Sequence, residues 1–108
     1  MKISVESKIS CSETEKIDLI YKKSPENKMY QCMYKYTISK GGTEFSISSV
    51  YFFNYNEYSA VLYAVRQAES DVKKYLHEKG FSFHKQLLDE AWNKYIDSHQ
   101  AKLFPEQH

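Results

Sequence analysis

The sequence has very little arginine, cysteine, proline or glycine: one, two, two and three residues respectively in a chain of 108. Arginine is the usual side chain for reading guanine and for binding paired phosphate oxygens, so a single Arg66 disfavours a DNA-reading surface. Cys11 and Cys32 form no C-x-x-C pair, and a chain of this size does not need a disulfide. We therefore expect two reduced thiols in a cytoplasmic protein.

Long apolar runs and an excess of charge of one sign are missing as well. No stretch approaches the roughly 20 apolar residues of a membrane-spanning helix, and the first residues have no signal-like apolar run, so no membrane association is expected. The 15 basic and 14 acidic residues leave a net charge of +1. Strong nonspecific attraction to nucleic acid is therefore not expected. The length and the ordinary share of hydrophobic residues, 42%, predict one domain over 1–108.

The first half of the chain alternates polar and apolar residues with a period of two, which is typical of half-buried strands. Strands are predicted over about 2–10, 16–23, 29–39 and 44–53. Lys40-Gly41-Gly42-Thr43 predicts a hairpin turn, because paired glycines supply the positive backbone angles that a tight turn needs. From Ser48 onward the alternation is lost, and residues 50–53 are all apolar. Either a bulge shifts the register there or both faces of the strand are covered.

The second half changes to the period of 3.6 residues that an amphipathic helix requires. Helices are predicted over about 56–79 and 83–101, with Asn54 or Asn56 as the first N-cap and Gly80 ending the first helix. Four successive strands followed by two helices predict an α+β fold. We expect a four-stranded antiparallel sheet in ββββαα order, with both C-terminal helices packed on one face.

A search for chemical motifs finds none. The histidines lack the H-x-x-x-H and H-E-x-x-H spacings of zinc sites; they are His77, His84, His99 and His108. Cys32 falls on the predicted core face and is interpreted as a buried structural thiol, whereas the reactivity of Cys11 is left open. The Gly41–Gly42 pair joins two strands rather than a strand and a helix, so it does not fit a phosphate-binding loop. We therefore expect no catalytic residue, no metal and no cofactor, and hence no enzyme.

The face of the sheet turned away from the helices carries the main functional hypothesis. Alternation predicts a polar surface there, yet several apolar residues fall on it beside lysines. The predicted partner-binding residues are Ile20, Lys22, Met29, Met33, Lys35, Val50 and Phe52. An apolar cluster with a charged rim is typical of a protein interface, and tyrosine, with ten copies here, is enriched at binding hot spots. The sequence predicts a non-enzymatic protein-binding module that occludes its partner sterically, such as an inhibitor or immunity-type protein of a phage or mobile element.

Two other classes of function remain open from the sequence. One is a nucleic-acid-binding domain that uses the lysines of the same sheet face, although acidic residues oppose them there. The other is a small-ligand carrier or enzyme, because a curved sheet under a long helix can enclose an apolar ligand. An unpaired edge strand would also allow a homodimer.

Overall fold

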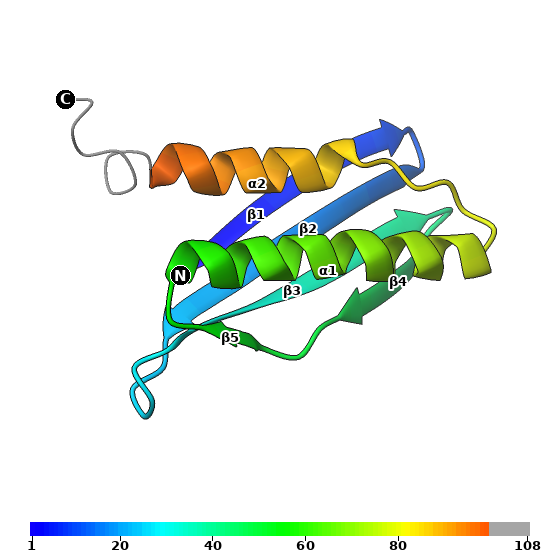
Figure 1. Ribbon diagram of the computed structural model, residues 1–108. Helices are drawn as coiled ribbons and strands as arrows, with labels where there is room; N and C mark the ends of the chain where they lie inside the picture. The colour runs from blue at the N-terminus through cyan, green and yellow to red at the C-terminus, as the bar shows by residue number, and fades with distance from the viewer. Residues whose placement is uncertain (100–108) are drawn as a thin grey trace.

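The computed structural model describes residues 1–99, which form five strands followed by two helices (Figure 1). The elements are β1 (Lys2–Ser10), β2 (Glu13–Lys23), β3 (Tyr30–Lys40), β4 (Thr43–Ser48), β5 (Phe52–Asn54), α1 (Glu57–Glu78) and α2 (Gln86–Ser98). The predicted α+β fold, with its strands before its helices, is confirmed. Within residues 1–99, neither helix has the length and apolar character needed to cross a lipid bilayer.

Two element boundaries differ from the sequence prediction in ways that affect the surface. The single strand predicted over 44–53 is divided into β4 and β5, with three residues between them. The second helix begins at Gln86 rather than at 83. The predicted continuation of that helix to 101, and the terminal His108, lie outside the described residues.

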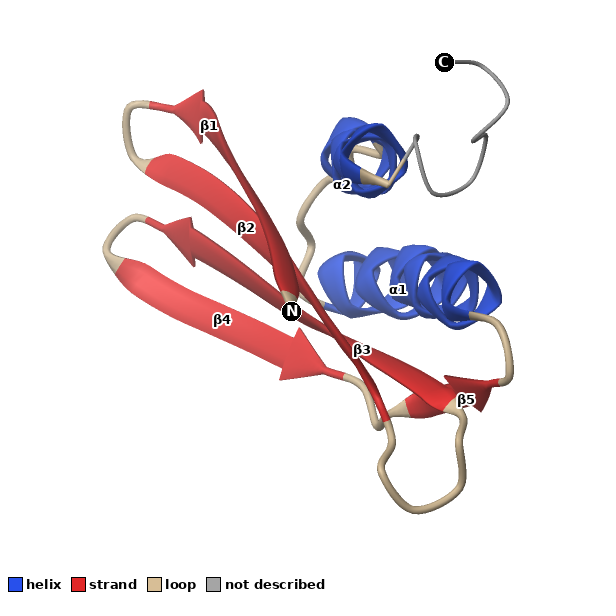
Figure 2. Ribbon diagram, turned by 90° about the vertical axis from the view of Figure 1, so that its left-hand side faces the viewer, coloured by secondary structure: helices blue, strands red, loops and turns tan. Residues whose placement is uncertain are grey.

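The sheet is antiparallel, with strand order β1-β2-β3-β4 and with β5 pairing to β3 beyond the end of β4. Gly41 and Gly42 both have positive φ, +60° and +83°, which forms the predicted tight turn between β3 and β4. Figure 2 views the sheet from its side and shows both helices on one face. The predicted placement of the helices is therefore confirmed, and we call the helix-covered face inner and the opposite face outer.

Helix α1 has a distinct signal at each end. The Oδ1 atom of Asn56 accepts a hydrogen bond from the backbone N–H of Ser59 at 3.1 Å, so Asn56 is the N-cap. At the other end Gly80 has a φ of +75°, and the N–H of Phe81 donates to the carbonyl of Leu76 at 2.8 Å. This glycine-terminated arrangement satisfies carbonyls of the last turn and directs the chain back toward α2.

The core between the helices and the inner face is rich in tyrosine. Its largest fully buried side chains are Tyr34, Tyr36, Tyr95, Ile17, Leu19, Ile38, Leu76 and Leu87. The hydroxyl of each of these three tyrosines donates a hydrogen bond to a carboxylate: Tyr34 to Asp71 at 2.6 Å, Tyr36 to Glu15 at 2.8 Å and Tyr95 to Glu57 at 3.0 Å. These bonds allow a polar ring to be buried without leaving its hydroxyl unsatisfied.

Glu15 is the most enclosed carboxylate of these pairs, with a side chain on the inner face of β2 and a residue exposure of 5%. Burial raises the pKa of Glu15 above its ordinary value, while the hydrogen bond from Tyr36 opposes that rise. Burial, followed by the bond to Glu15, raises the pKa of the Tyr36 hydroxyl. The raised pKa keeps the proton on the Tyr36 hydroxyl, which donates to the Glu15 carboxylate.

We expect Tyr36→Phe to lower the free energy of unfolding by about 1.5–3 kcal/mol, because the buried Glu15 oxygen loses a hydrogen bond to a charged group. Urea denaturation monitored by circular dichroism measures this change. Tyr63→Phe is the matched control, since Tyr63 is 58% exposed and its hydroxyl can be solvated. Equal effects of the two variants would contradict the role assigned to the Tyr36–Glu15 bond.

Glu15→Gln tests the pH dependence that follows from the raised pKa. The folded state holds the Glu15 proton more tightly than the unfolded state, so stability from this group is full below its ordinary pKa and is lost as pH rises through the raised value. Glutamine has no such titration and keeps an acceptor for Tyr36. The stability of the natural chain relative to Glu15→Gln should therefore fall with rising pH across this acid window. Urea denaturation of both chains at several pH values would detect it, and a constant difference would count against it.

Candidate protein-binding surface

Four residues of the predicted partner-binding set lie together on the outer face. Ile20 on β2 stands directly opposite Met33 on β3, and both are half-buried. Lys22 follows Ile20 by two residues on β2, and Lys35 follows Met33 by two residues on β3; both lysines are exposed. This part of the surface follows from simple alternation, because β2 and β3 pair without interruption from Glu13 to Lys23.

The pairing of β3 with the next segment is interrupted by a bulge. Lys35 stands opposite Ser48, but Cys32 stands opposite Phe52. Four steps along the β4–β5 segment therefore match three steps along β3, so one extra residue is inserted between them. Since side chains alternate with a period of two, this insertion exchanges the two faces for every residue beyond it. The bulge is the first of the two explanations that the sequence left open.

The predicted position of Phe52 on the outer face is wrong. Phe52 is paired with Cys32 on the inner face, and its ring lies 4.9 Å from the ring of Tyr63 on α1, measured between centroids. Val50 lies in the bulge and is 74% exposed. Met29 precedes β3 at the β2–β3 turn, is half-buried, and its carbonyl accepts the N–H of Ser24 at 2.7 Å.

Two aromatic residues that sequence reasoning missed occupy the outer face instead. Phe53 stands opposite Gln31 and is 49% exposed. The ring of Tyr51 lies beneath the ammonium group of Lys22, with 5.6 Å from Nζ to the ring centroid. The only signal in the sequence was the run of four apolar residues at 50–53. When all residues of a run are apolar, alternation does not show which side chains face solvent.

We define the outer patch as Ile20, Met33, Tyr51 and Phe53. Lysines border it: Lys22 covers Tyr51, Lys2 stands opposite Ile20, and Lys35 follows Met33 by two residues on β3. The patch thus has an apolar and aromatic centre with a mainly cationic rim, which is the composition of a protein interface core and its edge.

The other half of the outer face is polar and electrically mixed. Glu6 stands opposite Lys16, and Asp18 stands opposite Lys35 and accepts a hydrogen bond from the hydroxyl of Ser4. These cross-strand neighbours of opposite charge offset one another. A stripe of lysines able to follow a phosphate backbone is therefore interrupted by Glu6 on β1 and Asp18 on β2.

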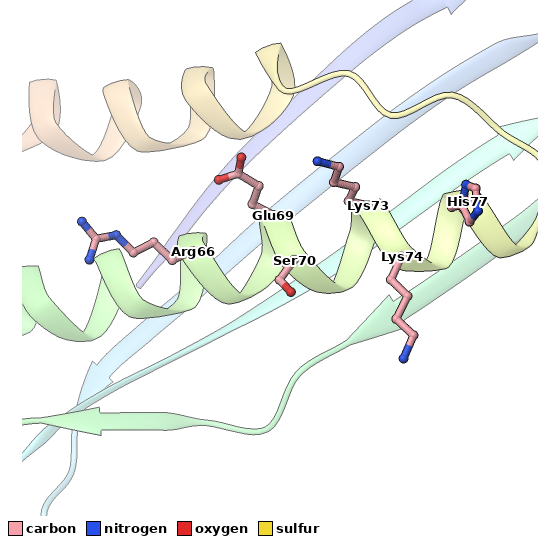
Figure 3. A pocket seen from close by; sticks show the side chains of 6 residues that line it. All are labelled: Arg66, Glu69, Ser70, Lys73, Lys74 and His77. Atoms are coloured by element: carbon pink, nitrogen blue, oxygen red, sulfur yellow. The ribbon is translucent and has the colours of Figure 1, made fainter.

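A depression of about 520 Å³ lies along the solvent side of α1 (Figure 3). It is lined by Arg66, Glu69, Ser70, Lys73, Lys74 and His77. In Figure 3 the Glu69 and Lys73 side chains extend to one side of the helix and Lys74 to the other. Because every lining residue comes from one helix, the depression has no second wall, and it lacks the enclosure of a ligand site.

A second depression, of about 320 Å³, lies where α1 begins and α2 ends. Its polar groups already satisfy one another: Glu57 Oε1 accepts the hydroxyl of Tyr95 at 3.0 Å and lies 3.4 Å from Nε2 of His99. The Nδ1 atom of His99 lies 3.0 Å from the carbonyl oxygen of Tyr95 and 2.8 Å from the hydroxyl oxygen of Ser98. The arrangement fastens the end of α2 to the start of α1.

The remaining reactive groups do not converge on a site. Within residues 1–99 no three histidine, cysteine or acidic side chains are placed to share a metal ion. Burial, with the nearby charge of Glu57, raises the pKa of the Cys32 thiol to about 12, so this residue is a neutral core thiol. Cys11 is exposed in the β1–β2 turn.

Comparisons of the chain with models of known protein families, with curated proteins and with solved structures find no match. The distinguishing property of the candidate surface is the outer patch of apolar and aromatic residues. Both helices lie on the other face of the sheet (Figure 2).

Phe52 and Phe53 form a matched pair for testing the register of β5. Phe52→Ala should lower the free energy of unfolding by about 1–3 kcal/mol, because its ring packs against α1 and the core. Phe53→Ala should change it by less than about 1 kcal/mol, because Phe53 is half-exposed. Urea denaturation of both variants under one set of conditions checks this order. The reverse order would place Phe53 inside and remove the outer patch.

Proposed function

We propose that this chain is a non-enzymatic protein-binding module whose outer patch docks onto an apolar area of a partner protein. The observation that carries the proposal is the clustering of Ile20, Met33, Tyr51 and Phe53 on the sheet face opposite the helices. A single exposed apolar residue needs no explanation, whereas a contiguous cluster with a polar rim is characteristic of an interaction site.

The rigidity of the surface supports this proposal. Met33 lies on β3, which pairs with β2 on one side and with β4 and β5 on the other. Behind the patch, Cys32 and Tyr34 of the same strand are buried against the helices. Docking on such a support requires little ordering of the main chain, which lowers the entropic cost of association. Tyr51 and Phe53 would supply the aromatic anchors on which binding energy is usually concentrated.

The charged rim indicates the chemistry of the partner. Lys2, Lys22 and Lys35 border the patch, and Asp18, which stands opposite Lys35, accepts a hydrogen bond from Ser4. A complementary partner would therefore present an apolar centre with acidic residues around it. The lysine rim would act mainly on the rate of association, and salt would screen it.

A steric inhibitor is the biological role that best fits these features. A small rigid module with a single sheet surface can cover the working surface of another protein without any chemistry of its own. We place it in the cytoplasm, in the manner of an inhibitor or immunity-type protein of a phage or mobile element. Nucleic-acid binding through the sheet is less well supported, because the lysines alternate with acids and Arg66 lies on α1.

Phe53→Thr and Met33→Thr should each weaken capture of the partner at least roughly tenfold, because each removes apolar contact at the centre of the patch and keeps strand propensity. The measurement is affinity capture from a lysate of the organism that encodes the chain, quantified by mass spectrometry, followed by titration with the purified partner. Raised salt should slow association.

Tyr55→Thr is the control, because Tyr55 is a 76% exposed aromatic residue outside the patch. It should retain the partner, and all three variants should show the circular dichroism spectrum of the natural chain. Failure to recover a stoichiometric partner, or equal recovery with Phe53→Thr and with Tyr55→Thr, would refute the proposal.

A further inference from the structure

The two edges of the sheet differ in how they are closed. At β1, Met1 and Tyr21 exchange two backbone hydrogen bonds, so alternate residues, Ser4 among them, turn their N–H and C=O groups away from β2. Helix α2 packs over β1 and β2, and the ammonium group of Lys94 donates to the outward carbonyl of Ser4 at 3.0 Å. A lysine on an edge carbonyl is a known way of blocking strand addition.

Among the described residues 1–99, none covers the β4 edge in this way. The N–H of Ser49 donates to the carbonyl of Tyr34 at 3.0 Å, so Ser49 and every second residue before it direct their backbone N–H and C=O groups toward β3. By alternation, Glu44, Ser46 and Ser48 turn their backbone groups outward. Within residues 1–99 these groups have no hydrogen-bond partner, and all three residues are exposed. The strand also has no proline and no inward-facing charge.

The inner face of β4 is only half covered. Helix α1 packs over β2, β3 and β5, and Phe45 and Ile47 project beyond it as half-buried residues. Phe81, after the end of α1, contacts Phe45 at a centroid distance of 5.4 Å. A shallow depression of about 340 Å³ lies over Ile47, between β4 and the last turns of α1. An apolar row beside an open edge can therefore be extended by an added strand.

We propose that β4 pairs antiparallel with β4 of a second copy of this chain, about a twofold axis at Ser46. The strand is symmetric about that residue, with Phe45 before it and Ile47 after it. Pairing in this register places Phe45 of each copy opposite Ile47 of the other, so apolar residues meet on the inner face. Glu44 then stands opposite Ser48 of the second copy, which keeps the two like charges at opposite ends.

The helices leave room for this association. In the joined sheet the two β3 strands, over which the α1 helices lie, are three strand spacings apart, roughly 14 Å. Two packed helices need about 8–10 Å. The space between them would be occupied by the Phe45, Ile47 and Phe81 side chains of both copies. A twofold axis perpendicular to the sheet leaves both outer patches on the same face, so the dimer would be bivalent toward a partner.

Sedimentation equilibrium of the full chain over a concentration series tests the self-association. Ser46→Lys places two like charges face to face on the axis, and Ser46→Pro removes an edge N–H that the monomer does not use. Each should weaken dimerisation roughly tenfold or more. Thr37→Lys is the matched control, because Thr37 is opposite Ser46 on β3 and adds the same charge one strand inward.

A chain that stays monomeric up to its solubility limit would overturn the proposal. So would a dimer that Ser46→Lys and Ser46→Pro leave intact, since its interface would then lie elsewhere. If Phe53→Thr breaks the dimer and the Ser46 variants do not, the copies meet through the outer patch, and this proposal is also wrong. Partner capture by a monomeric Ser46→Lys chain reports on the outer patch separately, so the two proposals can fail independently.

Discussion

The arrangement of the surface depends on the register between β3 and the segment that contains β4 and β5. One extra residue between Ser48 and Phe52 exchanges the inward-facing and outward-facing positions of β5 relative to those of β4. Without it, Phe52 would face solvent, and Tyr51 and Phe53 would compete for the space under α1. With it, Phe52 completes the inner face beside Cys32 and Tyr63, while on the outer face Phe53 stands opposite Gln31 and the Tyr51 ring lies beneath Lys22. A local change in hydrogen bonding thus decides the composition of two surfaces.

Tyrosine has a different role in this molecule from the one its abundance suggested. Tyr34, Tyr36 and Tyr95 lie inside the core, where each hydroxyl donates to a carboxylate on another element. The Tyr34–Asp71 bond joins the sheet to α1, whereas Tyr36–Glu15 joins β3 to β2 within the sheet and Tyr95–Glu57 joins the two helices. Enrichment of tyrosine at interfaces is real in general, but here Tyr51 alone belongs to the outer patch.

The two faces of the sheet differ from each other, and so do its two edges. One face is covered by two helices, and the other carries an apolar patch at one end and paired charges at the other. One edge is closed by α2 and Lys94, and the other presents a short symmetric strand. Residues 1–99 leave open, at two places, surfaces that natural proteins usually protect, and this contrast is the physical basis of both proposals.

The sequence by itself determined the order of strands and helices, the glycine turn at Gly41–Gly42 and the end of α1 at Gly80, because periodicity and positive φ are properties of a few neighbouring residues. It also determined the faces of Ile20 and Met33, whose strands pair without interruption. Only the tertiary structure decided the faces of Phe52 and Phe53, since a bulge exists only relative to the strand opposite. The same holds for the carboxylate partners of the tyrosines, which are joined across 21 to 38 residues of chain by folding alone.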